Sequence, residues 1–208
     1  MILSLFGGDK KAGVQLEHAR VYLRPPKTAD WRDWADLRTQ SRDFLTPWEP
    51  TWPNDALTRQ AFRRRLRQYD YEWEQGSGFS FFVFHKKSDL LLGGISFSNV
   101  RRGVSQTASL GYWVGEPHAR QGYMSEALLA SLEFAFDRLG LHRVEAACLT
   151  NNQASQKLLV KSGFSQQGYA RQYLRIDGRW QDHLLFEILR NDPRGAAALQ
   201  PDSMKSSA

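Results

Sequence analysis

The chain has 208 residues, and its 28 lysines and arginines exceed its 22 aspartates and glutamates, which gives a formal net charge of +6. The single cysteine, Cys148, excludes a disulfide framework and a thiolate-rich metal site, so we expect a reducing compartment, the cytoplasm. No apolar run approaches the roughly 18 residues that cross a bilayer, and the first residues, MILSLFGG, are too short and lack the basic lead of a secretion signal. The positive charge favours polyanionic partners such as nucleotides, phosphorylated cofactors or RNA-rich particles.

This length predicts one domain, which we place at residues 1–190. Residues 191–208 are small and polar, and we expect them to form a mobile tail.

Apolar and polar residues alternate from Val14 onward, which predicts a first strand that ends at Leu23 or Arg24, before two prolines. Thr28 is expected to cap a helix that ends at Gln40. The segment FLTPWEPTWPN interrupts the helical pattern, and a second helix is expected over residues 56–75.

Three strands follow in a meander, at residues 79–85, 90–100 and 106–115, with short turns between them. The next helix is expected over residues 121–139, where Gly140 has the place of a C-terminal cap.

A strand at residues 143–150 precedes a helix that begins at Asn151 or Asn152 and closes at Gly163. The last two strands, residues 164–176 and 179–189, are joined by an Asp-Gly pair that predicts a tight hairpin turn. The order of elements is β-α-α-β-β-β-α-β-α-β-β. It predicts an α+β fold with a mixed, mostly antiparallel sheet of seven strands, with one right-handed crossover and local parallel pairing.

The segment from Gly111 to Phe136 runs from a strand through a polar turn into a helix. Backbone N–H groups at the start of a helix have no internal partner, so this turn can hold an anion such as a pyrophosphate, and Gly122 allows the phosphates to approach the main chain. On these residues alone, a glycine that merely begins a packed helix explains the pattern equally well.

This segment, together with Asn152, Ser155, Leu158, Gly163 and Phe164, resembles the GNAT superfamily of acetyl-CoA-dependent N-acetyltransferases, whose element order is also the one predicted above. More narrowly, the bacterial RimJ-like enzymes, which acetylate the N-terminal alanine of a ribosomal protein, are similar in the segments FLTPWEP, GISFSNVRRG, LGYWVG and GYARQYLRIDGRWQDHLL. The likeness covers residues 14–189.

The resemblance implies that the strand before the helix splays from its neighbour, pairs through its main chain with the pantetheine amides and polarises the thioester carbonyl with one N–H. An amine then attacks directly, without an acyl-enzyme. The implied acetyl-CoA-binding residues are Tyr112, Trp113, Val114, Arg120, Gln121, Gly122, Tyr123, Met124, Ser125 and Asn152. Arg120 stands where the family has its first glycine, so its side chain is expected to contact the pyrophosphate.

For the acceptor amine, Glu49 in the turn Pro47-Trp48-Glu49-Pro50 is the first candidate as general base or amine-binding group, and the alternative is a solvated glutamate on a stiff loop. Glu116 and Asp182 are the fallback candidates. The resemblance also implies that Ser155 lies near the thioester sulfur, where its hydroxyl would protonate the departing thiolate. Asn152 and Ser155 have the alternative of being only a helix cap and a first-turn residue.

Other features receive structural explanations. Cys148 has no recognisable catalytic partner and is expected to be a small buried hydrophobe. The five histidines show no metal-binding spacing, so no metal is expected. Arg63, Arg64, Arg65 and Arg67 are expected to form a solvated helix face, with docking on a ribosome-associated substrate as the alternative.

We therefore expect acetyl transfer from acetyl-CoA to a protein N-terminal amine, with a ribosomal protein as partner and without nucleic-acid specificity or membrane contact. The alternatives are an acetyltransferase for a small amine, such as an aminoglycoside or polyamine, and a non-catalytic acetyl-CoA-binding module. A basic RNA-binding domain ranks last because no nucleic-acid motif is present. The sequence leaves open a monomer or a homodimer.

Overall fold

The computed structural model describes residue 11 and residues 13–199. The segment MILSLFGG, considered above as a secretion signal, and the end of the expected tail, residues 200–208, lie outside the described residues.

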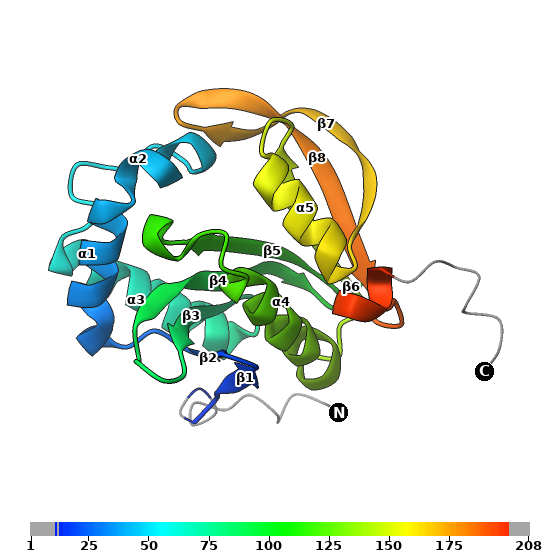
Figure 1. The fold of residues 1–208 in the computed structure, drawn as a ribbon, viewed down its shortest axis with the longest axis horizontal. Coiled ribbons are helices and arrows are strands. Elements are labelled where there is room, and N and C mark those ends of the chain that lie inside the picture. The colour runs from blue at the N-terminus through cyan, green and yellow to red at the C-terminus, as the bar shows by residue number, and fades with distance from the viewer. Residues whose placement is uncertain (1–10, 12, 200–208) are drawn as a thin grey trace.

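The described strands are β1 (Leu16–His18), β2 (Val21–Arg24), β3 (Phe79–His85), β4 (Leu91–Arg101), β5 (Thr107–Val114), β6 (Arg143–Leu149), β7 (Ser165–Ile176) and β8 (Arg179–Leu189). They form one sheet in the order β1-β2-β3-β4-β5-β6-β8-β7 (Figure 1). All neighbours pair antiparallel except β5 and β6, which pair in parallel. The predicted α+β class with a mixed, mostly antiparallel sheet is confirmed.

The expected count of seven strands is wrong, because the first predicted strand is a hairpin and the sheet has eight. The chain turns at Ala19 and Arg20, and Leu16 pairs with Leu23 across the turn. Ala19 has a φ of 37°, in the left-handed region that glycine or asparagine usually occupies. No turn-forming residue marks the reversal, and the apolar alternation continues through it, so the pattern gave no sign of two strands.

The described helices are α1 (Trp31–Gln40), α2 (Arg42–Leu45), α3 (Arg59–Gln75), α4 (Tyr123–Glu133) and α5 (Gln153–Ser162), with short 3-10 turns at Thr28–Asp30, Thr46–Trp48, Glu116–His118 and Gly195–Leu199. A π-helical turn, Phe134–Arg138, continues α4. The helices α4 and α5 lie over one face of the sheet, in front of it in Figure 1, and α1 and α3 pack on the other. None of the helices in the described part of the chain is long and apolar enough to cross a bilayer.

The start of α1 differs from the prediction, because Thr28–Asp30 forms a 3-10 turn and Asp30 is the N-cap residue of α1, without a side-chain hydrogen bond to the N–H groups of that helix. The Asp30 carboxylate accepts a hydrogen bond from the Lys27 amide at 2.7 Å and two from the Arg24 guanidinium at 2.7 and 2.8 Å. Asn152 caps α5 as predicted, since its Oδ1 accepts from the Ser155 amide at 3.0 Å.

The central strand β3 is covered on both sides, which explains why its apolar residues form a continuous run. Phe79, Phe81 and Val83 pack toward α4, and the intervening Phe82 and Phe84 pack toward α1 and α3. Burying each such side chain contributes roughly 1.5–3 kcal/mol. The sheet therefore lies between two cores, and Trp73 near the end of α3 packs against Phe79 and Phe81 in the core on the α4 side.

Within the described residues, the segment after residue 190 packs back onto the domain. Its 3-10 turn, Gly195–Leu199, lies against α5. Gly163, which ends α5 with a φ of 105°, faces the Pro193 carbonyl so closely that any Cβ there would collide with it.

Candidate active site

The sheet opens between β5 and β6. The two strands pair in parallel from Thr107 opposite Arg143 to Leu110 opposite Ala146, and beyond this point each stays only with its outer neighbour. The Gly115 amide donates to the Leu92 carbonyl of β4 at 2.9 Å, and backbone groups of alternate residues point to opposite sides of a strand. The N–H and C=O groups of Tyr112 and Val114 therefore point into the gap, where no strand receives them.

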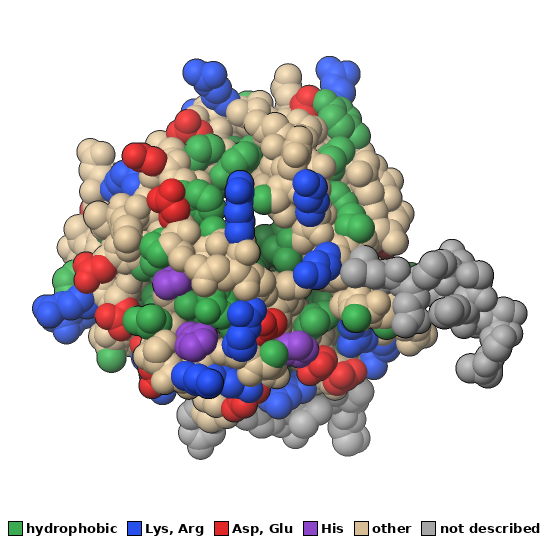
Figure 2. Space-filling view, viewed as in Figure 1, with side chains coloured by type: hydrophobic (Ala, Val, Ile, Leu, Met, Phe, Trp, Pro, Cys, Tyr) green, Lys and Arg blue, Asp and Glu red, His purple; other side chains and the backbone are tan. Residues whose placement is uncertain are grey.

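A hollow lies near the middle of the face that carries α4 and α5, and Lys and Arg side chains stand around it (Figure 2). An extended polyamide that enters here finds unpaired backbone donors and acceptors, and an anionic one is attracted by the surrounding cations.

The turn before α4 has the backbone of an anion-binding site. Gly122 has a φ of 84°, and Arg120, where the family has a glycine, also adopts a left-handed φ of 60°. Glu126 donates the first helical hydrogen bond, to the Gly122 carbonyl at 3.2 Å, so the N–H groups of residues 123–125 remain available at the positive end of the helix. Met124 is buried in the core and offers only its backbone.

Arg20, which the sequence analysis did not single out, holds this turn in place. From the β1–β2 turn it donates to the Gln121 carbonyl at 2.9 Å and to the Glu126 carboxylate at 2.7 Å, and its guanidinium lies 4.6 Å from the centre of the Tyr123 ring. The Gln121 side chain bonds the Pro117 carbonyl at 2.7 Å, inside the turn. Because all of these contacts are made within the protein, the turn has this conformation without a bound ligand. No local sequence signal joins Arg20 to Glu126, which are 106 positions apart.

Tyr112 and Trp113 point to opposite faces of the sheet. The Tyr112 hydroxyl lies 2.6 Å from the Ser155 hydroxyl of α5, whose amide is fixed by Asn152. Burial raises the pKa of Tyr112, so the phenol keeps its proton at neutral pH. Sequence reasoning assigned Tyr112 only a main-chain role and missed this hydroxyl. The backbone of Trp113 faces β4, and its ring enters the pocket on the other face.

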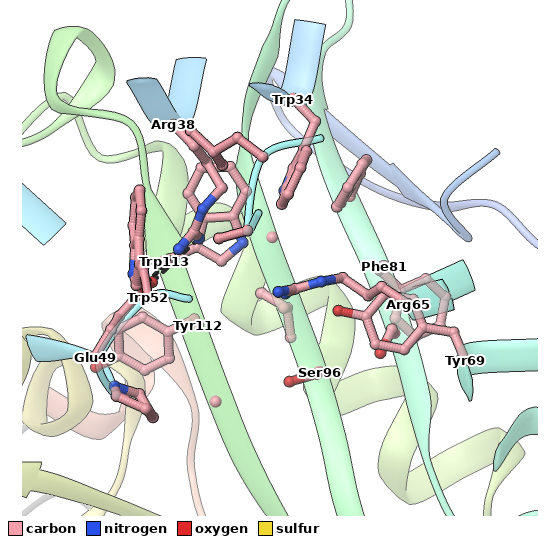
Figure 3. Close-up of a pocket in the computed structure, with 18 of the residues that line it drawn as sticks. Trp34, Arg38, Glu49, Trp52, Arg65, Tyr69, Phe81, Ser96, Tyr112 and Trp113 are labelled. Atoms are coloured by element: carbon pink, nitrogen blue, oxygen red, sulfur yellow. Dashed lines mark hydrogen bonds and ion pairs between the residues drawn. The ribbon is translucent and has the colours of Figure 1, made fainter. Parts of the chain in front are cut away.

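That pocket, of about 470 Å³, lies between the sheet and the loop that follows α2 (Figure 3). Aromatic side chains form much of its wall, and three charged residues line it: Arg38, Glu49 and Arg65. It touches β5 at Gly111, Tyr112 and Trp113, so the two faces meet at the splayed strand.

Glu49 is a bound carboxylate and not a solvated one. It forms an ion pair with the buried Arg38, and its Oε2 accepts from the Trp52 indole at 2.7 Å. The Arg38 guanidinium lies 4.3, 5.0 and 5.8 Å from the ring centres of Trp52, Trp113 and Trp34. The Glu49 carbonyl accepts from the Asp177 amide in the β7–β8 turn at 2.9 Å, which ties the loop to the last hairpin.

The fallback carboxylates lie apart from this pocket's lining. Glu116 is exposed after β5, and its amide bonds the Ser41 hydroxyl at 2.9 Å. Asp182 accepts from the Tyr169 hydroxyl and from the Gln172 amide, and these bonds, the tyrosine's first, lower the pKa of its carboxyl.

Cys148 is buried as predicted, and burial raises the pKa of its thiol, which keeps the thiol protonated. Within residues 13–199 and residue 11, no three His, Cys, Asp or Glu side chains gather in a way that could hold a metal ion.

Comparison with known proteins agrees with this geometry. The sequence model of the acetyltransferase (GNAT) domain matches residues 20–165. The [ribosomal protein uS5]-alanine N-acetyltransferase of Escherichia coli is 35% identical over 86% of this chain and 92% of its own length, and the probable N-acetyltransferase YjcK of Bacillus subtilis is 33% identical over 85% and 98%. The structure of Mycobacterium smegmatis RimJ in complex with a CoA-disulfide superposes with a TM-score of 0.81, at 28% identity over 86% of this chain and 88% of that one.

The chain therefore belongs to the GNAT acetyltransferase family. It is an acetyl-CoA-dependent N-acetyltransferase of the group that includes RimJ.

The left-handed conformation of Arg120 yields a first prediction. Arg120→Gly and Arg120→Ala both remove the guanidinium, but only alanine keeps the backbone strain, so the glycine variant should be more stable by about 1 kcal/mol. If the Arg120 side chain contacts the pyrophosphate, as the resemblance implies, both variants should bind acetyl-CoA about five- to tenfold more weakly at low salt. Thermal unfolding and calorimetric titration measure the two effects, and unchanged affinity in both variants would remove Arg120 from the binding site.

The buried hydroxyl pair yields a second prediction. Tyr112→Phe and Ser155→Ala each remove one hydroxyl and leave the β5 backbone intact, so kcat should fall by about 10- to 100-fold while acetyl-CoA affinity changes little. Single-turnover rates and direct titration separate the two quantities. A loss confined to acetyl-CoA binding would show that the pair is structural.

Proposed function

We propose that this enzyme acetylates the α-amine of a protein that begins with a small residue, with the N-terminal alanine of a ribosomal protein as its substrate. The observation that carries the proposal is the charge of the acceptor pocket. Its one carboxylate, Glu49, is already paired with Arg38, and Arg65 leaves the lining with a net positive charge.

A positive pocket favours an amine that loses its proton easily. An α-amine titrates near ~8 and a lysine side chain near ~10.4, and neighbouring cations lower the pKa of either one further. At neutral pH an α-amine is thus already partly in the neutral form that attacks a carbonyl. A lysine would need a strong base, and the pocket lining offers no unpaired carboxylate.

The same charge argues against the small-amine alternative. Aminoglycosides and polyamines carry several positive charges, and a site for them requires exposed carboxylates. The E. coli relative, named for alanine N-acetylation of ribosomal protein uS5, supports a protein N-terminus as the acceptor.

In this proposal, residues on the two faces of the sheet have different roles. On the α4 side, the N–H groups of residues 123–125, together with Arg120 and Gln121, would hold the pyrophosphate. The pantetheine arm would be held by Asn152 and by the backbone groups of Tyr112 and Val114 that face the gap. Acetyl-CoA supplies the acetyl group as a thioester. The Val114 N–H would stabilise the charge that develops on the thioester oxygen.

Proton transfers at both ends of the reacting bond complete the reaction. The amine nitrogen bonds to the acetyl carbon as the carbon–sulfur bond breaks. Glu49 takes the proton that the amine sheds, directly or through a water, with the acceptor capacity that Arg38 and Trp52 leave free. Ser155 gives a proton to the departing sulfur and takes one back from Tyr112. Tyr112 regains a proton from solvent, and Glu49 releases the amine's proton to solvent, so both residues return to their starting states.

A peptide panel tests the substrate assignment. Purified enzyme and acetyl-CoA are incubated with peptides that begin with Ala, Ser or Met and with a blocked peptide that contains an internal lysine, and mass spectrometry locates the acetyl group. We expect modification of the Ala and Ser α-amines, Ala most rapidly. Modification of lysine side chains alone would overturn the N-terminal assignment.

The role of Glu49 gives a separate prediction. Glu49→Gln keeps the shape of the side chain but cannot take a proton, so kcat should fall by about 100-fold with little change in acetyl-CoA affinity. Trp52→Phe is the matched comparison, since it removes one donor from Glu49 and spares the carboxylate, and its loss should be much smaller. Equal rates for Glu49→Gln and the unchanged enzyme from acidic to alkaline pH would exclude Glu49 as the base.

A further inference from the structure

Arg65 is the pocket cation that the mechanism above does not use. Sequence analysis placed it with its helix neighbours on a solvated face, and in the structure it is exposed and also lines the acceptor pocket. Figure 3 shows its guanidinium directed from α3 toward the middle of the cavity, on the side opposite Glu49.

The other pocket arginine has its charge satisfied, and Arg65 does not. Arg38 is paired with Glu49, and Arg64, one position before Arg65, is paired with Asp55. Within the described residues, no carboxylate lies within ion-pair distance of Arg65. Its guanidinium lies 5.4 Å from the centre of the Trp34 ring, a contact that orients the side chain and leaves its charge free.

The position of Arg65 distinguishes its role from that of Glu49. The amine must reach β5, where Tyr112 and Trp113 form one wall of the pocket. Arg65 remains solvent-exposed at the other side. If the first residue of the acceptor lies at β5, an acceptor side chain that contacts Arg65 therefore belongs to a later residue.

We propose that Arg65 selects acceptor polypeptides that carry an acidic side chain within the first few residues after the N-terminal one. This inference rests on the proposed function. A guanidinium without a carboxylate partner binds a carboxylate through paired N–H donors, and it repels a lysine or arginine at the same place. Because Arg65 is exposed, the selection is a moderate one that weakens as salt increases.

The test uses peptides that differ in one charge. A parent peptide begins Ala-Gln-Gln-Gln, and single replacements put Glu or Lys at position 2, 3 or 4 before a common tail. We expect one Glu peptide to have a kcat/KM about three- to tenfold above the parent, mainly through KM, and the Lys peptide of that position to lie below it. Raising the salt concentration should shrink both differences.

Variants assign the preference to this residue. Arg65→Gln should make the Glu and Gln peptides equivalent, and Arg65→Glu should reverse the order so that Lys is preferred. Arg67→Gln and Arg67→Glu make the same charge changes on an exposed residue of the same helix that is not part of the pocket lining, and they should leave the preference intact.

The outcomes separate this inference from the proposed function. If all Ala peptides are acetylated at equal rates whatever their charge, the inference fails and the proposed function stands. If Arg65→Gln slows the Glu and Gln peptides equally, Arg65 binds peptide carbonyls and the selection is refuted. If no peptide N-terminus is acetylated, the proposed function fails and this inference fails with it.

Discussion

The active site depends on the early end of one parallel strand pairing. β5 and β6 share hydrogen bonds only as far as Leu110 and Ala146, because beyond them β5 follows β4 and β6 follows β8. The backbone groups of Tyr112 and Val114 are thereby left without strand partners, a costly arrangement unless water or a ligand pairs with them. In the proposed reaction, an amine on one face of the sheet meets a thioester on the other through this opening.

Side chains of β5 connect the opening to both faces. Tyr112 reaches Ser155 on α5, and Trp113 reaches the Arg38 guanidinium, which is buried among indole rings and neutralised by Glu49. Removing one partner of such a buried pair costs about 3–5 kcal/mol, so Arg38 and Glu49 maintain the shape of the acceptor loop as well as its charge. The loop around Glu49 is thus held to α1 through Arg38 and to the β7–β8 turn through the Asp177 amide.

Local patterns predicted most of the fold, and long-range pairs account for what they missed. The Asp-Gly turn, the cap at Asn152 and the end of α5 at Gly163 follow from short-range rules, and the structure confirms them. The turn at Ala19 has no such signal. Contacts such as Arg20 with Glu126 and Arg38 with Glu49 form only in the folded chain, and the inward direction of Arg65 depends on how α3 packs against Trp34. The resemblance to a known family suggested where the acetyl donor binds, and only the packed structure showed the charge of the pocket that Arg38, Glu49 and Arg65 line.

The two proposed substrates depend on different parts of the chain, and this difference affects how the enzyme can evolve. In the proposed mechanism, donor recognition relies mainly on main-chain groups of β5 and of the turn before α4, which any residue able to adopt those conformations supplies. Acceptor recognition would instead rely on side chains of α1, α3 and the loop around Glu49, and on the β7–β8 turn at Asp177 that bonds this loop. Substitutions in the residues that line the acceptor pocket can therefore change the protein target while the acyl donor stays the same. A single ancestral fold can in this way give rise to enzymes with different protein targets.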